Sequence, residues 1–157
     1  MKKRLLPVLI SLFLVFSLCG CSSGGITGVW LFEDPAYESL YGIDPVQMYM
    51  QLNKDGTIIM ISVSKSDYYD TTSYEYIKGT YVEKEDGVLT CALNDCYMYL
   101  DSSGYGWSSM GGLGTEEISY VLDGNKLTVG DEMEFKRTNS LPSLPDQDEL
   151  NQMLSNS

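Results

Sequence analysis

The stretch VQMYMQLNKDGTIIMISVS, residues 46–64, decides the fold class of this chain. From Val46 to Leu52 apolar and polar side chains alternate, which is the pattern of a β-strand with one buried face. The chain then reaches Lys54-Asp55-Gly56, where Asp and Gly accept the backbone angles of a tight turn. Residues 57–64 are mostly β-branched or apolar, so they predict a second strand that pairs back on the first as a hairpin.

The same turn chemistry recurs along the chain, at residues 85–90 and 122–128. We interpret these segments as repeated hairpin turns rather than as the repeats of a solenoid. Short strands at this spacing predict an all-β antiparallel barrel or sandwich. The nine strand candidates are Val29–Phe32, Val46–Leu52, Thr57–Ser64, Tyr74–Val82, Val88–Leu93, Cys96–Leu100, Glu117–Leu122, Lys126–Val129 and Glu132–Arg137.

Composition excludes several classes of function. The chain has 157 residues, 22 acidic and 10 basic side chains, no histidine and a formal net charge of −12. This acidic balance argues against a nucleic-acid binder, which needs Lys and Arg to neutralise phosphates. Without histidine, Ser-His-Asp triads, Cys-His pairs and imidazole-bound metal sites are excluded. Several groups of neighbouring acidic residues could in principle act as paired catalytic carboxylates, but we interpret them as solvated turns and strand faces. We therefore expect a protein that is not an enzyme and needs no cofactor or metal.

The first twenty residues predict a secretory signal peptide. Lys2, Lys3 and Arg4 are followed by an apolar run from Leu5 to Leu18, which is shorter than the roughly 20 residues that span a bilayer. The next residues, Leu18-Cys19-Gly20-Cys21, resemble the lipobox of bacterial lipoproteins. That resemblance implies cleavage after residue 20 and a diacylglyceryl group on Cys21. The alternatives are an uncleaved membrane helix, or cleavage without lipid.

The expected mature chain, residues 21–157, is a lipid-anchored protein on the extracytoplasmic face of the cell membrane. Loss of the three basic residues of the signal peptide leaves seven basic against 22 acidic side chains, a formal charge of −15. Such a surface is repelled by anionic lipid, so two or more acyl chains would have to hold it. Residues 21–27 form a short tether, which keeps the folded part near the membrane.

Five short motifs, taken in order, resemble a small lipocalin-like domain found in many bacterial lipoproteins. They are Gly28-Val29-Trp30, Asp55-Gly56-Thr57, Gly79-Thr80-Tyr81, Asn125-Lys126-Leu127-Thr128 and Met133-Glu134-Phe135-Lys136-Arg137. The resemblance implies an up-and-down barrel of about eight or nine strands over residues 28–137. It also implies that Trp30 packs at one end of the barrel beneath Arg137, and that a small apolar or amphipathic ligand binds inside.

A barrel of this kind assigns one face of each strand to the interior. A hairpin with its tip at residues 92–95 would set Cys91 opposite Cys96, where an oxidising exterior permits a disulfide. The alternative is two reduced thiols in the core. The residues expected to face inward are Val46, Met48, Met50, Leu52, Ile59, Ile61, Val63, Leu89, Cys91, Met98, Leu100, Ile118, Tyr120, Leu122, Leu127, Val129, Met133 and Phe135.

Two segments depart from the strand pattern. Residues 101–115 are rich in glycine, and we interpret them either as a linker between hairpins or as a ligand-binding lid that carries Tyr105, Trp107 and Met110. Residues 138–157 form a polar C-terminal tail. In it Asp146 could cap a short helix with Leu150, Met153 and Leu154 on one face, either frayed or weakly docked or binding a partner.

Two functions remain after these exclusions. The first is a membrane-tethered barrel that binds a small apolar or amphipathic molecule. The alternative is a non-catalytic envelope module whose tyrosine-rich outer face or tail binds another surface protein. The sequence identifies neither the ligand nor the partner.

Overall fold

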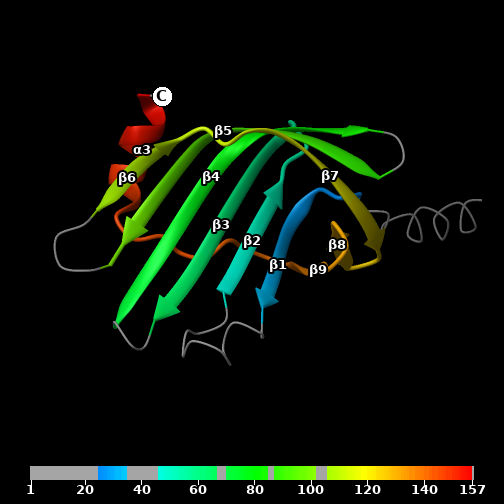
Figure 1. Ribbon diagram of the computed structural model, residues 1–157, viewed down its shortest axis with the longest axis horizontal. Helices are drawn as coiled ribbons and strands as arrows, with labels where there is room; N and C mark the ends of the chain where they lie inside the picture. The colour runs from blue at the N-terminus through cyan, green and yellow to red at the C-terminus, as the bar shows by residue number, and fades with distance from the viewer. Residues whose placement is uncertain (1–24, 35–45, 67–69, 85–86, 102–105, 157) are drawn as a thin grey trace, which may run out of the picture.

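The computed structural model describes residues 25–34, 46–66, 70–84, 87–101 and 106–156 (Figure 1). The predicted signal peptide, Cys21 and Tyr105 lie outside these residues. The described chain consists almost entirely of strands, with one short helix, α3 (Gln147–Ser155). The strands are β1 (Gly28–Asp34), β2 (Val46–Leu52), β3 (Thr57–Ser66), β4 (Thr71–Lys84), β5 (Val88–Leu100), β6 (Trp107–Gly111), β7 (Gly114–Asp123), β8 (Lys126–Val129) and β9 (Met133–Thr138).

Eight of these strands close into an antiparallel barrel. Strands β1 to β5 pair in sequence, β5 pairs with β7, and β7, β8 and β9 follow in turn. Pairing of β9 with β1 closes the ring, and β6 adds a ninth strand beside the second half of β5. The predicted all-β, up-and-down, lipocalin-like barrel is therefore confirmed.

The first hairpin forms where the sequence predicts it, and its turn sets the register of β2 against β3. The backbone N–H of Asn53 donates to the Thr57 carbonyl over 2.9 Å, and Gly56 has a φ of 83°, which favours glycine. The Thr57 hydroxyl donates to the Asp55 carboxylate over 2.7 Å, and this bond lowers the pKa of Asp55. Leu52 therefore lies opposite Ile58, and Met50 opposite Met60.

The predicted hairpin between residues 88–93 and 96–100 does not form, because residues 88–100 make one continuous strand, β5. Leu93 pairs with Gly79 and Asp95 pairs with Lys78, so Asn94 is an extra residue in a β-bulge rather than a hairpin tip. Gly79 permits the bulge, because a Cβ there would lie 2.1 Å from the Ala92 carbonyl oxygen.

The predicted disulfide between Cys91 and Cys96 is absent, and both cysteines are buried free thiols. Five steps along an extended strand separate two Cα atoms by roughly 16 Å. A disulfide needs a Cα separation of about 4.4–6.8 Å. The prediction was wrong because it depended on a hairpin between the two residues.

One face of the sheet forms the barrel interior. Its buried core consists of Ile26, Trp30, Met50, Leu52, Ile58, Ile77, Leu89, Cys91, Leu93, Cys96, Leu127, Val129 and Phe135. The prediction for β3 was wrong by one residue: Ile58 and Met60 face this core, whereas Ile59, Ile61 and Val63 face the other side. The register of the first hairpin decides this, because directly opposed residues share a face.

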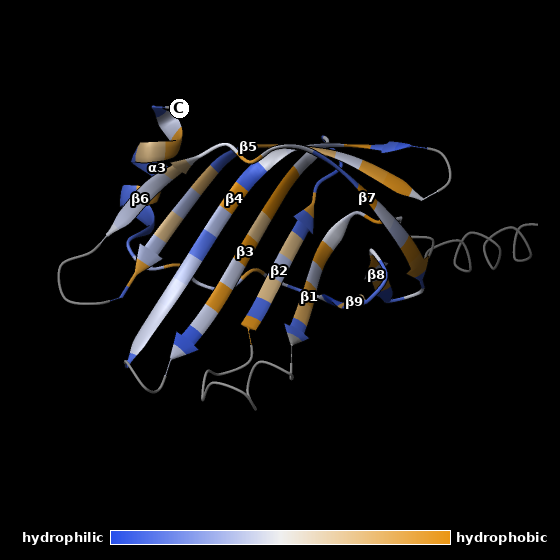
Figure 2. Ribbon diagram, viewed as in Figure 1, coloured by the Kyte–Doolittle hydropathy of each residue, from blue (hydrophilic) through white to orange (hydrophobic). Residues whose placement is uncertain are grey.

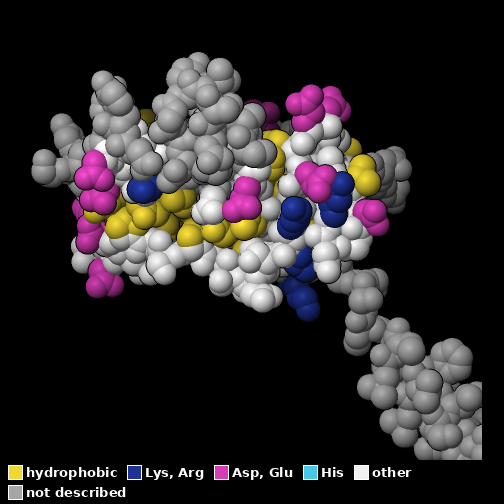
Figure 3. Space-filling model, turned by 90° about the horizontal axis from the view of Figure 1, so that it is seen from below, with side chains coloured by type: hydrophobic (Ala, Val, Ile, Leu, Met, Phe, Trp, Pro, Cys, Tyr) yellow, Lys and Arg dark blue, Asp and Glu magenta, His cyan; other side chains and the backbone are white. Residues whose placement is uncertain are grey.

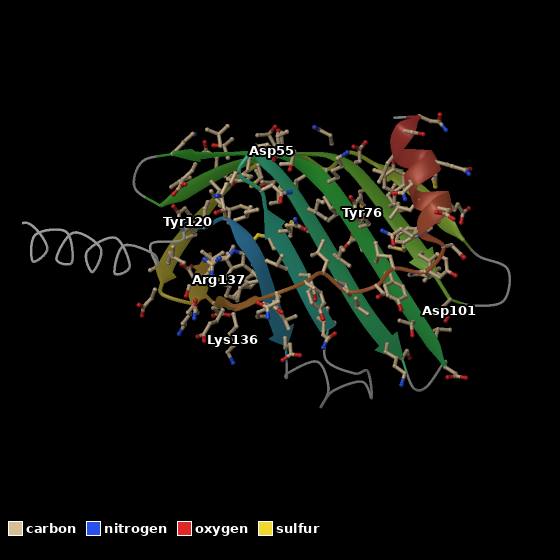
Figure 4. All side chains as sticks on the ribbon, turned by 180° about the vertical axis from the view of Figure 1, so that it is seen from behind. Asp55, Tyr76, Asp101, Tyr120, Lys136 and Arg137 are labelled. Atoms are coloured by element: carbon tan, nitrogen blue, oxygen red, sulfur yellow. The ribbon has the colours of Figure 1, made fainter. Side chains whose placement is uncertain are left out.

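The opposite face of β2 to β5 is apolar too, and the C-terminal segment covers it. The chain leaves β9, runs across the back of the sheet and ends in α3 beside β6 (Figure 4). Because both faces are buried, apolar residues occur on both sides of these strands. Figure 2 shows hydrophobic residues at intervals along the strands of the sheet. This outer cluster contains Tyr49, Ile59, Ile61, Val63, Tyr74, Tyr76, Tyr97, Tyr99, Trp107, Leu141, Leu144, Leu150, Met153 and Leu154.

The C-terminal segment is a docked element rather than a frayed tail. Leu150 is 2% exposed, and Met153 and Leu154 pack on the same cluster, as the predicted helix face requires. The predicted side-chain cap is absent: Asp146 has a φ of 41°, and its carboxylate accepts no hydrogen bond from a backbone N–H of the helix. The Asp146 carboxylate instead accepts a hydrogen bond from the Tyr99 hydroxyl over 3.0 Å.

We predict that Leu150→Ala lowers the free energy of unfolding by about 2–3 kcal/mol, because it opens a cavity beneath α3. Gln152→Ala, an exposed position on the same helix, should change it by less than about 0.5 kcal/mol. Urea denaturation of residues 21–157 of both variants measures the difference. Equal stability of the two variants would show that α3 is not docked.

Candidate functional site

Trp30 and Arg137 are cross-strand partners on β1 and β9, and their side chains pack together. Trp30 is fully buried, and its indole N–H donates to the Ile26 carbonyl over 2.8 Å. The Arg137 guanidinium carbon lies 4.2 Å from the ring centroid, a cation–π contact worth about 0.5–2 kcal/mol. The guanidinium also donates to the carbonyls of Thr27 and Gly25, over 2.8 and 3.1 Å. The contact that the lipocalin resemblance implies is therefore present.

The barrel interior holds an apolar hollow of about 170 Å³. Four methionines, Met48, Met50, Met60 and Met133, contribute to its lining, together with aliphatic side chains, Phe135 and the Cys91 thiol. No polar side chain among the described residues lines it. A lining of this kind favours an apolar occupant. Its volume is below the roughly 300 Å³ at which pockets for drug-sized ligands begin.

A polar hollow of about 190 Å³ lies beside the apolar one, on the same face of the sheet. It is lined by the serines Ser62, Ser64 and Ser73, by Glu75, and by Tyr74 and Met98. The two hollows are neighbours because Met48, which lines the apolar hollow, is the cross-strand partner of Ser62. The interior thus changes from apolar to polar within one cross-strand step.

The Glu75 carboxylate is half-buried and has one hydrogen-bond partner in the described structure. The Cys96 thiol donates to it over 3.7 Å. Burial raises the pKa of Cys96, and the neighbouring Glu75 carboxylate raises it further. Burial also raises the pKa of Cys91. Both thiols therefore lack the lowered pKa of a reactive cysteine.

A second tyrosine–carboxylate pair lies near the apolar hollow. The hydroxyl of Tyr120 donates to the Glu83 carboxylate. Burial and this hydrogen bond raise the pKa of Tyr120 to about 12. Tyr120 is the cross-strand partner of Val129, which lines the hollow, so the pair lies beside the hollow without lining it.

The predicted lid is not formed by residues 106–115. They belong mainly to β6 and the start of β7, and Trp107 is only 6% exposed. The Trp107 indole N–H donates to the Pro145 carbonyl over 3.0 Å, so this side chain anchors the C-terminal segment. Met110 is 59% exposed on β6, and Tyr105 lies outside the described residues.

Sequence reasoning missed Glu75 as an interior residue. The alternation Tyr74-Glu75-Tyr76 ordinarily indicates a strand whose tyrosines face the core and whose glutamate faces water. Here Tyr74 and Tyr76 pack in the outer cluster beneath the C-terminal segment, and Glu75 faces the interior. The available signal was the polar row formed by Ser62 and Ser64 on β3 and Ser73 on β4 itself, which breaks the apolar lining.

Comparison of the chain with protein-family models, with curated proteins and with solved structures found no match in any of the three. The likeness to lipocalins therefore consists of the barrel topology and the Trp30–Arg137 contact. In the part of the chain that the structure describes, no three metal-ligating side chains come together as a candidate metal site. No helix of the same residues has the length and apolar character needed to cross a bilayer.

We predict that Arg137→Met lowers the free energy of unfolding by about 2 kcal/mol, because it removes the cation–π contact and two hydrogen bonds to backbone carbonyls. Lys136→Met is the matched control, since Lys136 is the exposed neighbour on the same strand (Figure 4). It should change stability by less than about 0.5 kcal/mol. Thermal or urea unfolding compares the two, and a larger loss in the control would refute the assigned role of Arg137.

Proposed function

We propose that this chain is a lipid-anchored extracytoplasmic protein whose barrel binds a small apolar or amphipathic ligand. The observation that carries the proposal is the apolar hollow of about 170 Å³ in the barrel interior. An engineered cavity of about 150 Å³ in another protein binds benzene, so this hollow suits a molecule of that size or one short alkyl chain. The hollow is too small for a large hydrophobic ligand.

Binding rather than catalysis agrees with the chemistry of the interior. The whole chain contains no histidine, and burial raises the pKa of both core thiols. Neither thiol is thereby activated as a nucleophile. We therefore propose a non-enzymatic role that needs no cofactor.

The distribution of charge supports a membrane tether at one end of the molecule. Lys126 and Lys136 are cross-strand partners, and Arg137 follows in the chain and bonds to Gly25, the first described residue. These are three of the seven basic residues that follow the predicted cleavage point. Basic side chains gather on one side of the surface in Figure 3, among scattered acidic ones. An anchor at Cys21 would place Arg137, which bonds to Gly25, near the lipid headgroups.

One structural feature supports the alternative function, a module that binds another surface protein. Its tyrosine-rich face is covered by the C-terminal segment of the chain itself, so that face offers no free docking surface. Strand β6 pairs only with β5 among the described strands, and Ser108, Ser109 and Met110 on it are exposed. A partner of this module would add a strand at that edge.

Native mass spectrometry tests ligand binding directly. We predict that residues 21–157 purified from the host, after removal of the lipid, carry a bound small molecule. Met60→Trp should abolish this adduct, because the larger ring fills the apolar hollow. Met110→Trp should retain it, since Met110 is exposed on β6 outside the barrel. A bare mass for the unaltered protein would contradict the proposal.

Membrane fractionation tests the anchor. We predict that Cys21→Ser moves the protein from the membrane to the soluble fraction and abolishes labelling with a palmitate analogue, because the thiol that receives the lipid is lost. Cys19→Ser, two residues earlier in the same segment, should keep both properties. If Cys21→Ser remained in the membrane fraction, the chain would be held by an uncleaved helix or by a partner.

A further inference from the structure

The polar hollow contains acceptors arranged around a single carboxylate. Ser62 lies opposite Glu75 on β4, Glu75 lies opposite Met98 on β5, and Ser64 lies opposite Ser73. These side chains share one face of the sheet, because directly opposed residues point the same way. A carboxylate next to three hydroxyls favours an occupant that donates hydrogen bonds and carries positive charge.

Glu75 has no cationic partner in the described structure. Two ion pairs of the described residues, Lys84–Glu117 and Lys126–Glu134, involve neither Glu75 nor its neighbours in the polar hollow. Its hydrogen-bond donor is the Cys96 thiol, which is a weak one. A half-buried carboxylate with so weak a partner retains most of its capacity to accept hydrogen bonds.

The apolar hollow begins directly beside this carboxylate. Met48 lines the apolar hollow and is the cross-strand partner of Ser62, which in turn lies opposite Glu75. Two such steps span roughly 10 Å between Cα atoms. Long side chains and a short ligand bridge that distance.

We propose that the two hollows form one site for a short-chain primary alkylamine, with the ammonium group on Glu75 and the alkyl chain among the methionines. The inference rests on the proposed function and names its ligand class. The three N–H donors of a primary ammonium match the Glu75 carboxylate and two serine hydroxyls. An apolar hollow of about 170 Å³ takes one short chain, which excludes a two-chain lipid with an amine headgroup.

Isothermal titration of the mature chain with octylamine, octanol and octanoate tests the inference. We expect octylamine to bind about tenfold more tightly than octanol, and octanoate to bind most weakly. Glu75→Gln should remove the preference for the amine and leave octanol binding unchanged. Glu33→Gln is the matched control, because Glu33 lies on the opposite face of the sheet and bonds to Gln47. It should leave all three affinities unchanged.

The outcomes separate the two proposals. If octylamine and octanol bind equally, the role of Glu75 is wrong and ligand binding by the barrel stands. If none of the three probes binds, the proposed function fails, and the inference fails with it.

A charge reversal gives a second readout that does not depend on loss of binding. Glu75→Lys should prefer octanoate over octylamine, because the new ammonium attracts the carboxylate. A Glu75→Lys protein that folds, by its circular dichroism, and still prefers octylamine would overturn the inference.

Discussion

The structure depends on the register of the first hairpin, in which Leu52 lies opposite Ile58. A shift of one residue would exchange the two faces of β3. With the observed register, Ile58 and Met60 enter the barrel, and Ile59, Ile61 and Val63 point outward. Three apolar side chains on the outer face need a cover, and the C-terminal segment supplies it through Leu141, Leu144 and Leu150.

The same register gives the candidate site its character. In this register Ser62 lies opposite Glu75, and Glu75 lies opposite Met98. Polar side chains therefore lie next to the methionines on the inner face. Burial of both faces explains why tyrosines occupy the outer side of β4 and β5 while a glutamate lies inside. Neither Trp30 nor Arg137 lines the methionine-lined hollow, so their contact leaves it unfilled.

The barrel was predictable because its causes are local: alternation in β2, the Asp-Gly turns, and the order of the motifs from Trp30 to Arg137. The sequence-based predictions were wrong where the local structure depends on a segment far away in the sequence. The bulge at Asn94 depends on Gly79 of β4. Because of this bulge the chain forms one continuous strand with two free thiols, where a hairpin with a disulfide was predicted. The interior position of Glu75 depends on a C-terminal segment about 70 residues away, which alternation along β4 does not reveal.

Methyl nuclear Overhauser effects from Ile58 and Ile61 test this register most directly, because the two side chains lie on opposite faces of β3. The account predicts that Ile61 methyls contact Leu141, Leu144 or Leu150, and that Ile58 methyls contact Leu127 or Phe135 of the barrel core. Contacts from Ile61 to the barrel core, with Ile58 against the C-terminal segment, would contradict the register and the site derived from it.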